Sequence, residues 1–144
     1  MKAINDFKMS VLSKSANEGF IRAVSAAFCS LLDPTVEEIS DIKTAVSEAV
    51  TNSVVHGYKE KQGRIYIDAA LYPDNTIKIK IRDKGCGIED VKKAMEPLFT
   101  TAGDERSGLG FSVMESFSDK LKVSSVPGKG TVVTITKKIT GKCE

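Results

Sequence analysis

The sequence predicts an α+β domain in which helices cover one face of a mostly antiparallel sheet. Hydrophobic patterns indicate the order strand, helix, helix, and then four strands that are interrupted by a loop and a short helix. At 144 residues the chain has the length of one domain, 1–144, which can bury about two-thirds of its unfolded surface. We therefore expect two layers around a single core.

The first part of the chain is expected to contain one strand and two helices. The opening DFKMSVL alternates as an edge strand does, and residues 16–32 carry apolar side chains at helical spacing. A second helix is expected to begin at Asp33 and Pro34, as N-cap and first helical residue, and to run to about Val55 before Gly57 ends it. The apolar positions of the first helix are Phe20, Ala23, Val24, Ala27, Phe28 and Leu31.

The second part is expected to supply four strands in two hairpins. Residues 64–72 and 76–83 alternate between apolar and polar side chains and are joined across a Pro-Asp-Asn turn. Residues 121–126 and 131–139 form a second such pair around PGKG. Between the pairs lie the glycine-bearing stretch DKGCGI, a polar segment and a short helix at 110–117.

Composition and charge narrow the class of protein. No apolar run approaches the roughly 18 residues that cross a membrane, and the start lacks the apolar core of a signal peptide, so we expect a soluble, cytoplasmic protein without a membrane partner. The formal charge of +2 is spread over alternating acids and bases with no Lys/Arg block, which predicts no direct nucleic-acid partner. Three cysteines without a CxxC pair favour reduced thiols, and the only histidine lies far from them in sequence, which argues against zinc.

The second expected helix carries Glu48, Asn52 and His56 four residues apart, which places them in a narrow stripe at the edge of the apolar face. A solvent-exposed helix face would explain such a stripe, but no Lys or Arg stands four residues from Glu48 to pair with it. Where a cation and phosphates are held, Asn offers Mg²⁺ an uncharged oxygen and a carboxylate can accept a proton. The apolar face itself comprises Ile42, Val46, Ala49, Val50 and Ser53.

Three glycine-bearing segments follow this helix. Asp83 ends a strand, and Gly85 and Gly87 are spaced as in a loop where the backbone approaches a ligand closely. RSGLGF opens a helix whose first N–H groups suit phosphate, and GKGT lies at a hairpin turn. Each segment alone is explained as well by a plain turn. Their order and spacing are therefore the informative feature.

Taken in order, ExxxN followed by HG, then DxGxGI, GLGF and GxGT resemble the N, G1, G2 and G3 boxes of the GHKL ATPases, named for gyrase, Hsp90, histidine kinases and MutL. Within that superfamily the chain is similar to the small anti-sigma serine protein kinases, and SEAVTNSVVHGY, EPLFTT and SGLGFSVMESF carry that closer match. The resemblance covers roughly residues 5–139.

The resemblance implies a Bergerat-type two-layer α/β sandwich that holds ATP or ADP with Mg²⁺ between the helices and a lid. It implies that Glu48 is the general base and that Asn52 coordinates the metal. Asp83 would hydrogen-bond the adenine amino group, with help from Thr131. The other implied nucleotide-binding residues are Gly85 and Gly87 beneath the purine, Thr100, Thr101 and Arg106 in the lid, and Gly108, Leu109 and Gly110 at the phosphates.

The resemblance also implies a function. Such proteins bind a sigma factor as homodimers, block transcription, and phosphorylate a serine of an anti-anti-sigma antagonist. The segments PLFTT and SGLGF favour the type that controls the sporulation sigma factor, sigma F. The alternatives are a relative that controls a stress-response sigma factor, a stand-alone domain like that of histidine kinases, a gyrase or MutL type ATPase, and a binding module without catalysis. Glu18 and Arg22 are candidate partner contacts, whereas His56 is expected to be structural and Cys86 needs no role.

Overall fold

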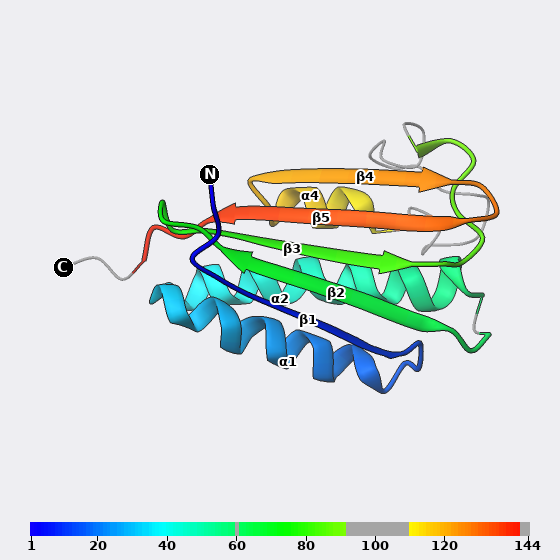
Figure 1. Cartoon of the computed structure of the whole chain (residues 1–144), viewed down its shortest axis with the longest axis horizontal. Helices are drawn as coiled ribbons and strands as arrows, with labels where there is room; N and C mark the ends of the chain where they lie inside the picture. Colours follow the sequence, from blue (N-terminus) through cyan, green and yellow to red (C-terminus); the bar gives the residue numbers. More distant parts are fainter. Residues whose placement is uncertain (60, 92–109, 142–144) are drawn as a thin grey trace.

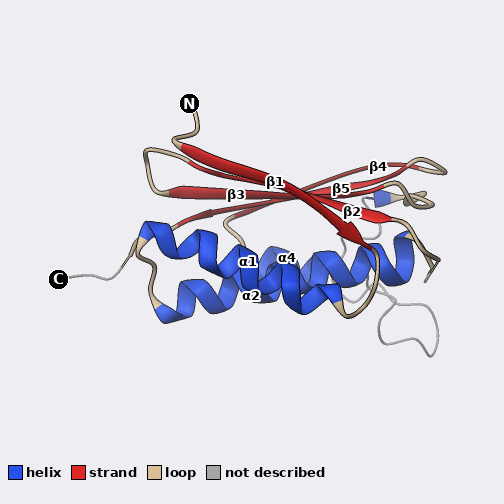
Figure 2. Cartoon of the chain, turned by 60° about the horizontal axis from the view of Figure 1, so that its bottom comes forward, coloured by secondary structure: helices blue, strands red, loops and turns tan. Residues whose placement is uncertain are grey.

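The computed structural model describes residues 1–59, 61–91 and 110–141, which form a five-stranded sheet with helices on one side. The strand order is β1-β2-β3-β5-β4, and each pair of neighbours is antiparallel. Figures 1 and 2 show the helices gathered on one face of the sheet, so the predicted two-layer α+β arrangement is confirmed. The strands are β1 Asn5–Leu12, β2 Arg64–Leu71, β3 Thr76–Asp83, β4 Lys120–Val126 and β5 Gly130–Lys138.

Within residues 1–59, 61–91 and 110–141 the helical layer consists of three α-helices and two short turns of other types. Helix α1 is followed directly by a 3-10 turn, and helix α2 by the π-helical turn η2. In the part of the chain that the structure describes, no helix combines the length and apolar character needed to cross a bilayer. The elements are α1 Asn17–Cys29, η1 Ser30–Leu32, α2 Val36–Thr51, η2 Asn52–Gly57 and α4 Phe111–Ser116.

The strands follow the alternation that predicted them. Along β2 and β3 every second residue is buried under the helices, and the residues between them face the other side of the sheet. The buried positions are filled mostly by isoleucine, whose branched side chain suits a pleated surface. The fully or nearly fully buried apolar members of these two strands are Ile65, Ile67, Ala69, Leu71, Ile77, Ile79 and Ile81.

Helix α1 is shorter and rotated relative to the sequence expectation. It ends at Cys29, and the next three residues form the 3-10 turn. Its buried line is Ile21, Ser25 and Cys29, whereas Phe20 and Leu31 are 53% and 64% exposed. The helix has apolar residues on more than one side, so hydrophobic spacing alone did not identify the face that packs on α2 and the sheet.

Helix α2 begins at a different cap from the predicted one. Thr35 is the N-cap: its side chain accepts from the Glu38 N–H at 3.1 Å, and the Glu38 carboxylate accepts from the Thr35 N–H at 3.0 Å. The prediction of an N-cap at Asp33 is wrong, because this reciprocal capping box satisfies two helix-terminal N–H groups at once. Asp33 instead adopts a left-handed conformation, φ 55°, at the end of the 3-10 turn.

The other end of α2 also differs from expectation. The α-helix stops at Thr51, and residues 52–57 continue as a π-helix in which the Tyr58 N–H donates to the Ser53 carbonyl at 2.8 Å. The predicted core face is nevertheless confirmed, because all five of its residues are buried. A π-turn widens the helix and is often found at functional sites.

Candidate functional site

The expected site residues gather where the C-terminal half of α2 and η2 meets the end of β3 and the start of α4. Figure 1 shows this end of α2 beneath the sheet, at the end of β3 that leads into the 84–91 loop. The described part of the site contains Glu48, Asn52, Asp83, Gly85, Gly87, Gly110 and Thr131. The predicted residues Thr100, Thr101, Arg106, Gly108 and Leu109 lie outside the described residues.

Asp83 is the most enclosed carboxylate of the site, at 2% exposed. It accepts from the Ser53 hydroxyl at 2.8 Å and from the Gly85 N–H at 2.9 Å. Burial raises its pKa, while the hydrogen bonds from Gly85, Ser53 and Thr131 lower it and do not fully offset the burial. The carboxylate is therefore fixed in place, and a ligand donor that reached it would form a hydrogen bond with little competition from water.

Ser53 and Gly57 position this carboxylate, and the sequence analysis gave neither of them that role. A Cβ on Gly57 would lie 3.0 Å from the Asp83 carboxyl atoms, so the absence of a side chain leaves room for the acid. The available signal was Ser53 itself, a hydroxyl among the apolar residues of the core face, because a buried hydroxyl usually has a hydrogen-bond partner.

The loop that follows β3 is packed against the chain's own backbone. The Cys86 N–H donates to the Gly57 carbonyl at 2.8 Å, and a Cβ on Gly85 would lie 2.2 Å from that same oxygen. Gly87 has a left-handed φ of 77° and closely approaches the Val126 carbonyl. In the described structure both glycines thus permit close contacts between segments of the protein, and their expected approach to a purine stays a prediction.

Thr131 lies beside Asp83 on the neighbouring strand, as their register shows. It is 3% exposed, and its hydroxyl is 2.9 Å from that of Ser125. Ser125 also accepts from the Ile88 N–H at 2.8 Å, which ties the loop after β3 to the β4–β5 hairpin. The acid, the threonine and the loop therefore form one connected polar cluster.

Glu48 lies at the other end of the site, against the start of α4. A Cβ on Gly110 would lie 2.4 Å from Glu48 Oε1, and Gly110 itself has a φ of 71°. Burial raises the pKa of the Glu48 carboxyl, and the carboxylate of Glu18 raises it further. Glu48 is thus a half-buried acid with an elevated pKa, which is a property of groups that exchange protons near neutral pH.

Asn52 lies one helical turn from Glu48 and is 4% exposed. Its side-chain oxygen Oδ1 is buried and finds no hydrogen-bond partner among the described residues. Most buried polar atoms are satisfied, so this oxygen is a candidate ligand atom. An uncharged amide oxygen suits Mg²⁺, which commonly takes one or two protein ligands and completes its shell with phosphate oxygens and water.

The remaining expectations concern side chains beside this cluster. Glu18 and Arg22 form an ion pair on α1 at 2.9 Å, and the Ser47 hydroxyl donates to the same Glu18 carboxylate. His56 is half-buried within η2, and its carbonyl accepts from the Cys86 thiol at 3.2 Å. Glu18 therefore connects α1 electrostatically to the edge of the site.

Comparison with known proteins shows to which family the chain belongs. Residues 13–137 match the family model of the histidine kinase-like ATPase domain. Over 140 residues the chain is 56% identical to the anti-sigma F factor of Thermoanaerobacter sp. (strain X514), covering 96% of this chain and 97% of that protein. The anti-sigma F factor of Caldanaerobacter subterraneus subsp. tengcongensis is 57% identical at the same coverage, and that of Clostridium acetobutylicum 53% over 135 residues, covering 93% and 94%.

Solved structures agree on the fold. The RsbU and RsbW domains of Rv1364c from Mycobacterium tuberculosis align with a TM-score of 0.65 at 17% identity, covering 94% of this chain and 32% of that one. The blue-light activated histidine kinase of Erythrobacter litoralis EL346 aligns with a TM-score of 0.60 at 20% identity, covering 85% and 42%. This chain therefore spans less than half the length of either. On the sequence matches, the chain belongs to the family of anti-sigma F factors, which carry a histidine kinase-like ATPase domain.

Proposed function

We propose that the chain is an anti-sigma factor and serine protein kinase: it binds a sigma factor of the sigma F type and uses Mg-ATP to phosphorylate a serine of an anti-anti-sigma antagonist. The first half is supported by identity of 53–57% to anti-sigma F factors over nearly their whole length. The second half is carried by one observation, the unsatisfied buried oxygen of Asn52 one turn from the half-buried Glu48.

The residues present fit a nucleotide with its metal. Asn52 Oδ1 would be the protein ligand to Mg²⁺, and the bound metal would neutralise charge on the phosphates. The Asp83 carboxylate, with Thr131 beside it, would accept from the adenine amino group. Among the described residues no group of three or more His, Cys, Asp or Glu side chains gathers, so phosphate and water would complete the metal shell. The predicted lid and phosphate-loop residues would act from outside this part.

Glu48 would accept the hydroxyl proton of the substrate serine. The serine oxygen would form a bond to the terminal phosphorus of ATP while the bond between that phosphorus and the ADP oxygen breaks. Phosphoryl transfer depends mainly on positioning and charge stabilisation, so one base beside the phosphates suffices. The raised pKa of Glu48 makes the carboxylate a stronger base than an exposed glutamate. The contact with Gly110 would hold that base next to the helix start at which phosphates are expected.

The same proposal covers the partners. The ion-paired Glu18 and Arg22 on α1 are candidate contacts to the sigma factor or the antagonist, and the protein is expected to act as a homodimer in the cytoplasm, where transcription takes place. We expect no direct contact of this chain with nucleic acid or with a membrane.

The test measures transfer of labelled phosphate from ATP, in the presence of Mg²⁺, to the purified anti-anti-sigma antagonist encoded by the same organism. We expect an acid-stable label on one serine, which Glu48→Gln reduces by about 10²–10⁴-fold while nucleotide affinity is retained. Glu37→Gln, an exposed acid on the same helix, is the matched control and should transfer at the wild-type rate. An acid-labile label would favour a histidine-kinase-like activity, and transfer at full rate by Glu48→Gln would refute the assignment of the base.

The metal assignment has its own measurement. Asn52→Ala should weaken binding of Mg-ATP while leaving the weaker binding of metal-free ATP nearly unchanged, because the lost oxygen contacts the metal and not the nucleotide. Titration calorimetry with and without Mg²⁺ separates the two. An equal effect on both forms would assign Asn52 to the nucleotide itself.

A further inference from the structure

The side of the sheet opposite the helices carries a concentration of positive charge that sequence order conceals. The basic residues of β3 alternate with isoleucines, so all of them point to the outer side. The same holds for the lysines of β4. We call this surface the basic face and define it by Lys78, Lys80, Arg82, Lys84, Lys120 and Lys122.

The basic face is unbalanced by acids. The outward positions of strands β3, β4 and β5 include no Asp or Glu. Six positive charges therefore gather there in a chain whose formal net charge is only +2. On the outer side of the neighbouring strand β2, Asp68 stands opposite Lys80 in the register and pairs with Lys8 of β1 at 4.0 Å. The sequence has no Lys/Arg block, and it is the alternation along the strands that brings these basic residues together on one side of the sheet.

The strand register arranges these charges in two lines. Lys80 and Lys122 flank Thr134 in one row, and Lys78 and Lys120 flank Thr136 in the next. Two strand spacings separate the lines, which is about 10 Å, and lysines within a line repeat every 7 Å or so. The result is two lines of lysines, which we call the basic walls, on either side of the Thr134 and Thr136 hydroxyls of β5.

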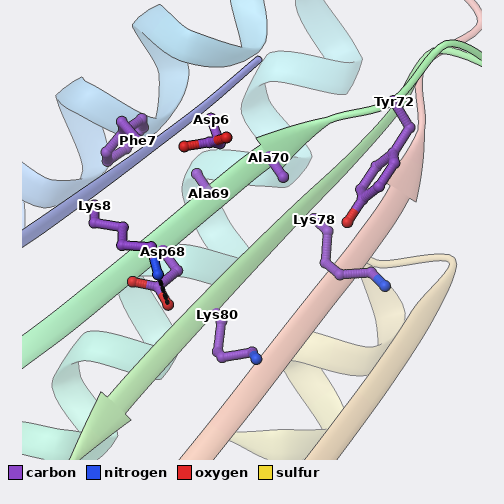
Figure 3. Close-up of a pocket in the computed structure, with 9 residues that line it drawn as sticks. All are labelled: Asp6, Phe7, Lys8, Asp68, Ala69, Ala70, Tyr72, Lys78 and Lys80. Atoms are coloured by element: carbon purple, nitrogen blue, oxygen red, sulfur yellow. Dashed lines mark ion pairs between the residues drawn. The ribbon is translucent and has the colours of Figure 1, made fainter. Parts of the chain in front are cut away.

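Figure 3 shows the basic wall on β3. Lys78 and Lys80 extend from β3 on the outer side of the sheet, toward β5. A hollow lies next to them, where the small Ala70 stands between Asp6 and Lys78 in the register. The basic side chains are thus accessible beside a surface with little steric obstruction.

We propose that the basic face docks an acidic polypeptide segment in an extended conformation. Asp or Glu at alternate positions of an extended chain repeat at the same spacing of about 7 Å as the lysines of each wall. The threonine hydroxyls between the walls can donate to and accept from backbone amides. This surface is on the side of the sheet away from the candidate site, so the proposal does not rest on the kinase activity.

Two features favour a polypeptide over nucleic acid or lipid. Single-stranded nucleic acids bind to basic surfaces that also present free aromatic rings. Here the Tyr66 ring is covered by Arg82 at 4.6 Å and Lys84 at 5.1 Å, and Lys78 lies over Tyr72 at 5.5 Å. Membrane surfaces usually require apolar side chains that insert, and the two outward positions between the lysines are Thr134 and Thr136. A second copy is disfavoured because it would present the same charge.

The experiment uses a fluorescent peptide of alternating Glu and Thr with eight residues, the length of β3, titrated with the whole protein at low salt. We expect saturable one-to-one binding, with amide shifts in NMR spectra concentrated at β5 residues Thr134 and Thr136. Lys80→Glu/Lys122→Glu should weaken binding by about tenfold or more, since two attractive pairs become repulsive. Lys14→Glu/Lys43→Glu removes the same net charge from exposed sites elsewhere and should change affinity by less than about twofold.

Several results would overturn the proposal. Equal losses in the two double variants would show only a general charge effect, and absence of binding or of shifts on β5 would remove the docking surface. Two other probes are tested, a single-stranded oligonucleotide and a phosphatidylserine vesicle. If either bound more tightly than the peptide and lost affinity only in Lys80→Glu/Lys122→Glu, the basic face would be assigned to nucleic acid or to membranes instead. The NMR measurement on the wild type keeps the test valid if a variant folds poorly.

Discussion

Glu38 joins the start of α2 to the end of the chain, and its charge should determine how stability depends on pH. Besides the Thr35 N–H, its carboxylate accepts from the Thr140 N–H at 2.8 Å, the Thr140 hydroxyl at 2.7 Å and the Gly141 N–H at 3.2 Å. One side chain thus caps a helix and anchors the segment that follows β5. Glu38→Gln keeps the size and one acceptor oxygen but removes the charge.

The magnitude follows from the pKa of Glu38. Burial alone would raise it, but the hydrogen bonds from Thr35, Thr140 and Gly141 outweigh burial and lower the pKa from 4.5 to about 2. A shift of that size corresponds to at most about 3 kcal/mol. We expect about 2 kcal/mol, because Thr140 is exposed and water screens part of the interaction. A lowered pKa means that this stability is present above pH 4.5 and is lost as the pH falls toward 2.

Urea unfolding of both proteins between pH 7 and pH 2.5 measures this contribution. The variant should be about 2 kcal/mol less stable at pH 7, and the difference should shrink as the acid form of Glu38 accumulates in the wild type. Glu37→Gln is the control, since Glu37 is an exposed acid in the same first turn. A difference between wild type and Glu38→Gln that stayed constant over the whole pH range would refute the reasoning, because the effect would then not come from the charge.

Three further predictions concern the candidate site. Gly85→Ala places a Cβ 2.2 Å from the Gly57 carbonyl, so urea unfolding should show a loss of stability of about 2 kcal/mol. The control is Gly19→Ala in helix α1, where the nearest atom to the new Cβ is 3.6 Å away, and this change should be neutral or stabilising. Equal effects of the two substitutions would contradict the close packing at Gly85. Ser53→Ala removes a donor to Asp83, so stability should fall by about 1–3 kcal/mol and more at pH 8 than at pH 5, because the carboxyl with a raised pKa loses support for its charged form; a smaller loss at pH 8 would contradict this sign. Glu18→Gln should shift the acid limb of the rate profile for phosphate transfer to lower pH by lowering the pKa of Glu48, as initial rates across the limb would show, and a shift to higher pH would contradict the electrostatic link.

Strands and buried faces were the features most accessible from the sequence. The isoleucine alternation of β2 and β3 reflects one buried and one open side, and the five predicted core-face residues of α2 and η2 are all buried. Helix ends were harder to predict. Asp33 and Thr35 are both good N-cap residues, and only Thr35 has a glutamate three positions later that completes the reciprocal bonds. The π-turn after Thr51 could not be predicted from periodicity, because it is stabilised by contacts with the loop after β3, such as the Cys86 N–H on the Gly57 carbonyl.

The site shows the same division between what is local and what depends on the fold. Glu48 and Asn52 were singled out as site candidates by their four-residue spacing on the helix. Asp83 was singled out by its place at the end of a strand, just before two glycines. Ser53 and Gly57 were not, since their importance comes from Asp83, which is 30 residues further along the chain from Ser53. Both residues lie in the π-turn η2, which contacts strand β3. A Cβ on Gly57 would lie 3.0 Å from the Asp83 carboxyl atoms, so Gly57→Ala should press that buried acid away from its donors, and the free energy of unfolding should fall even though no residue of the predicted site was changed.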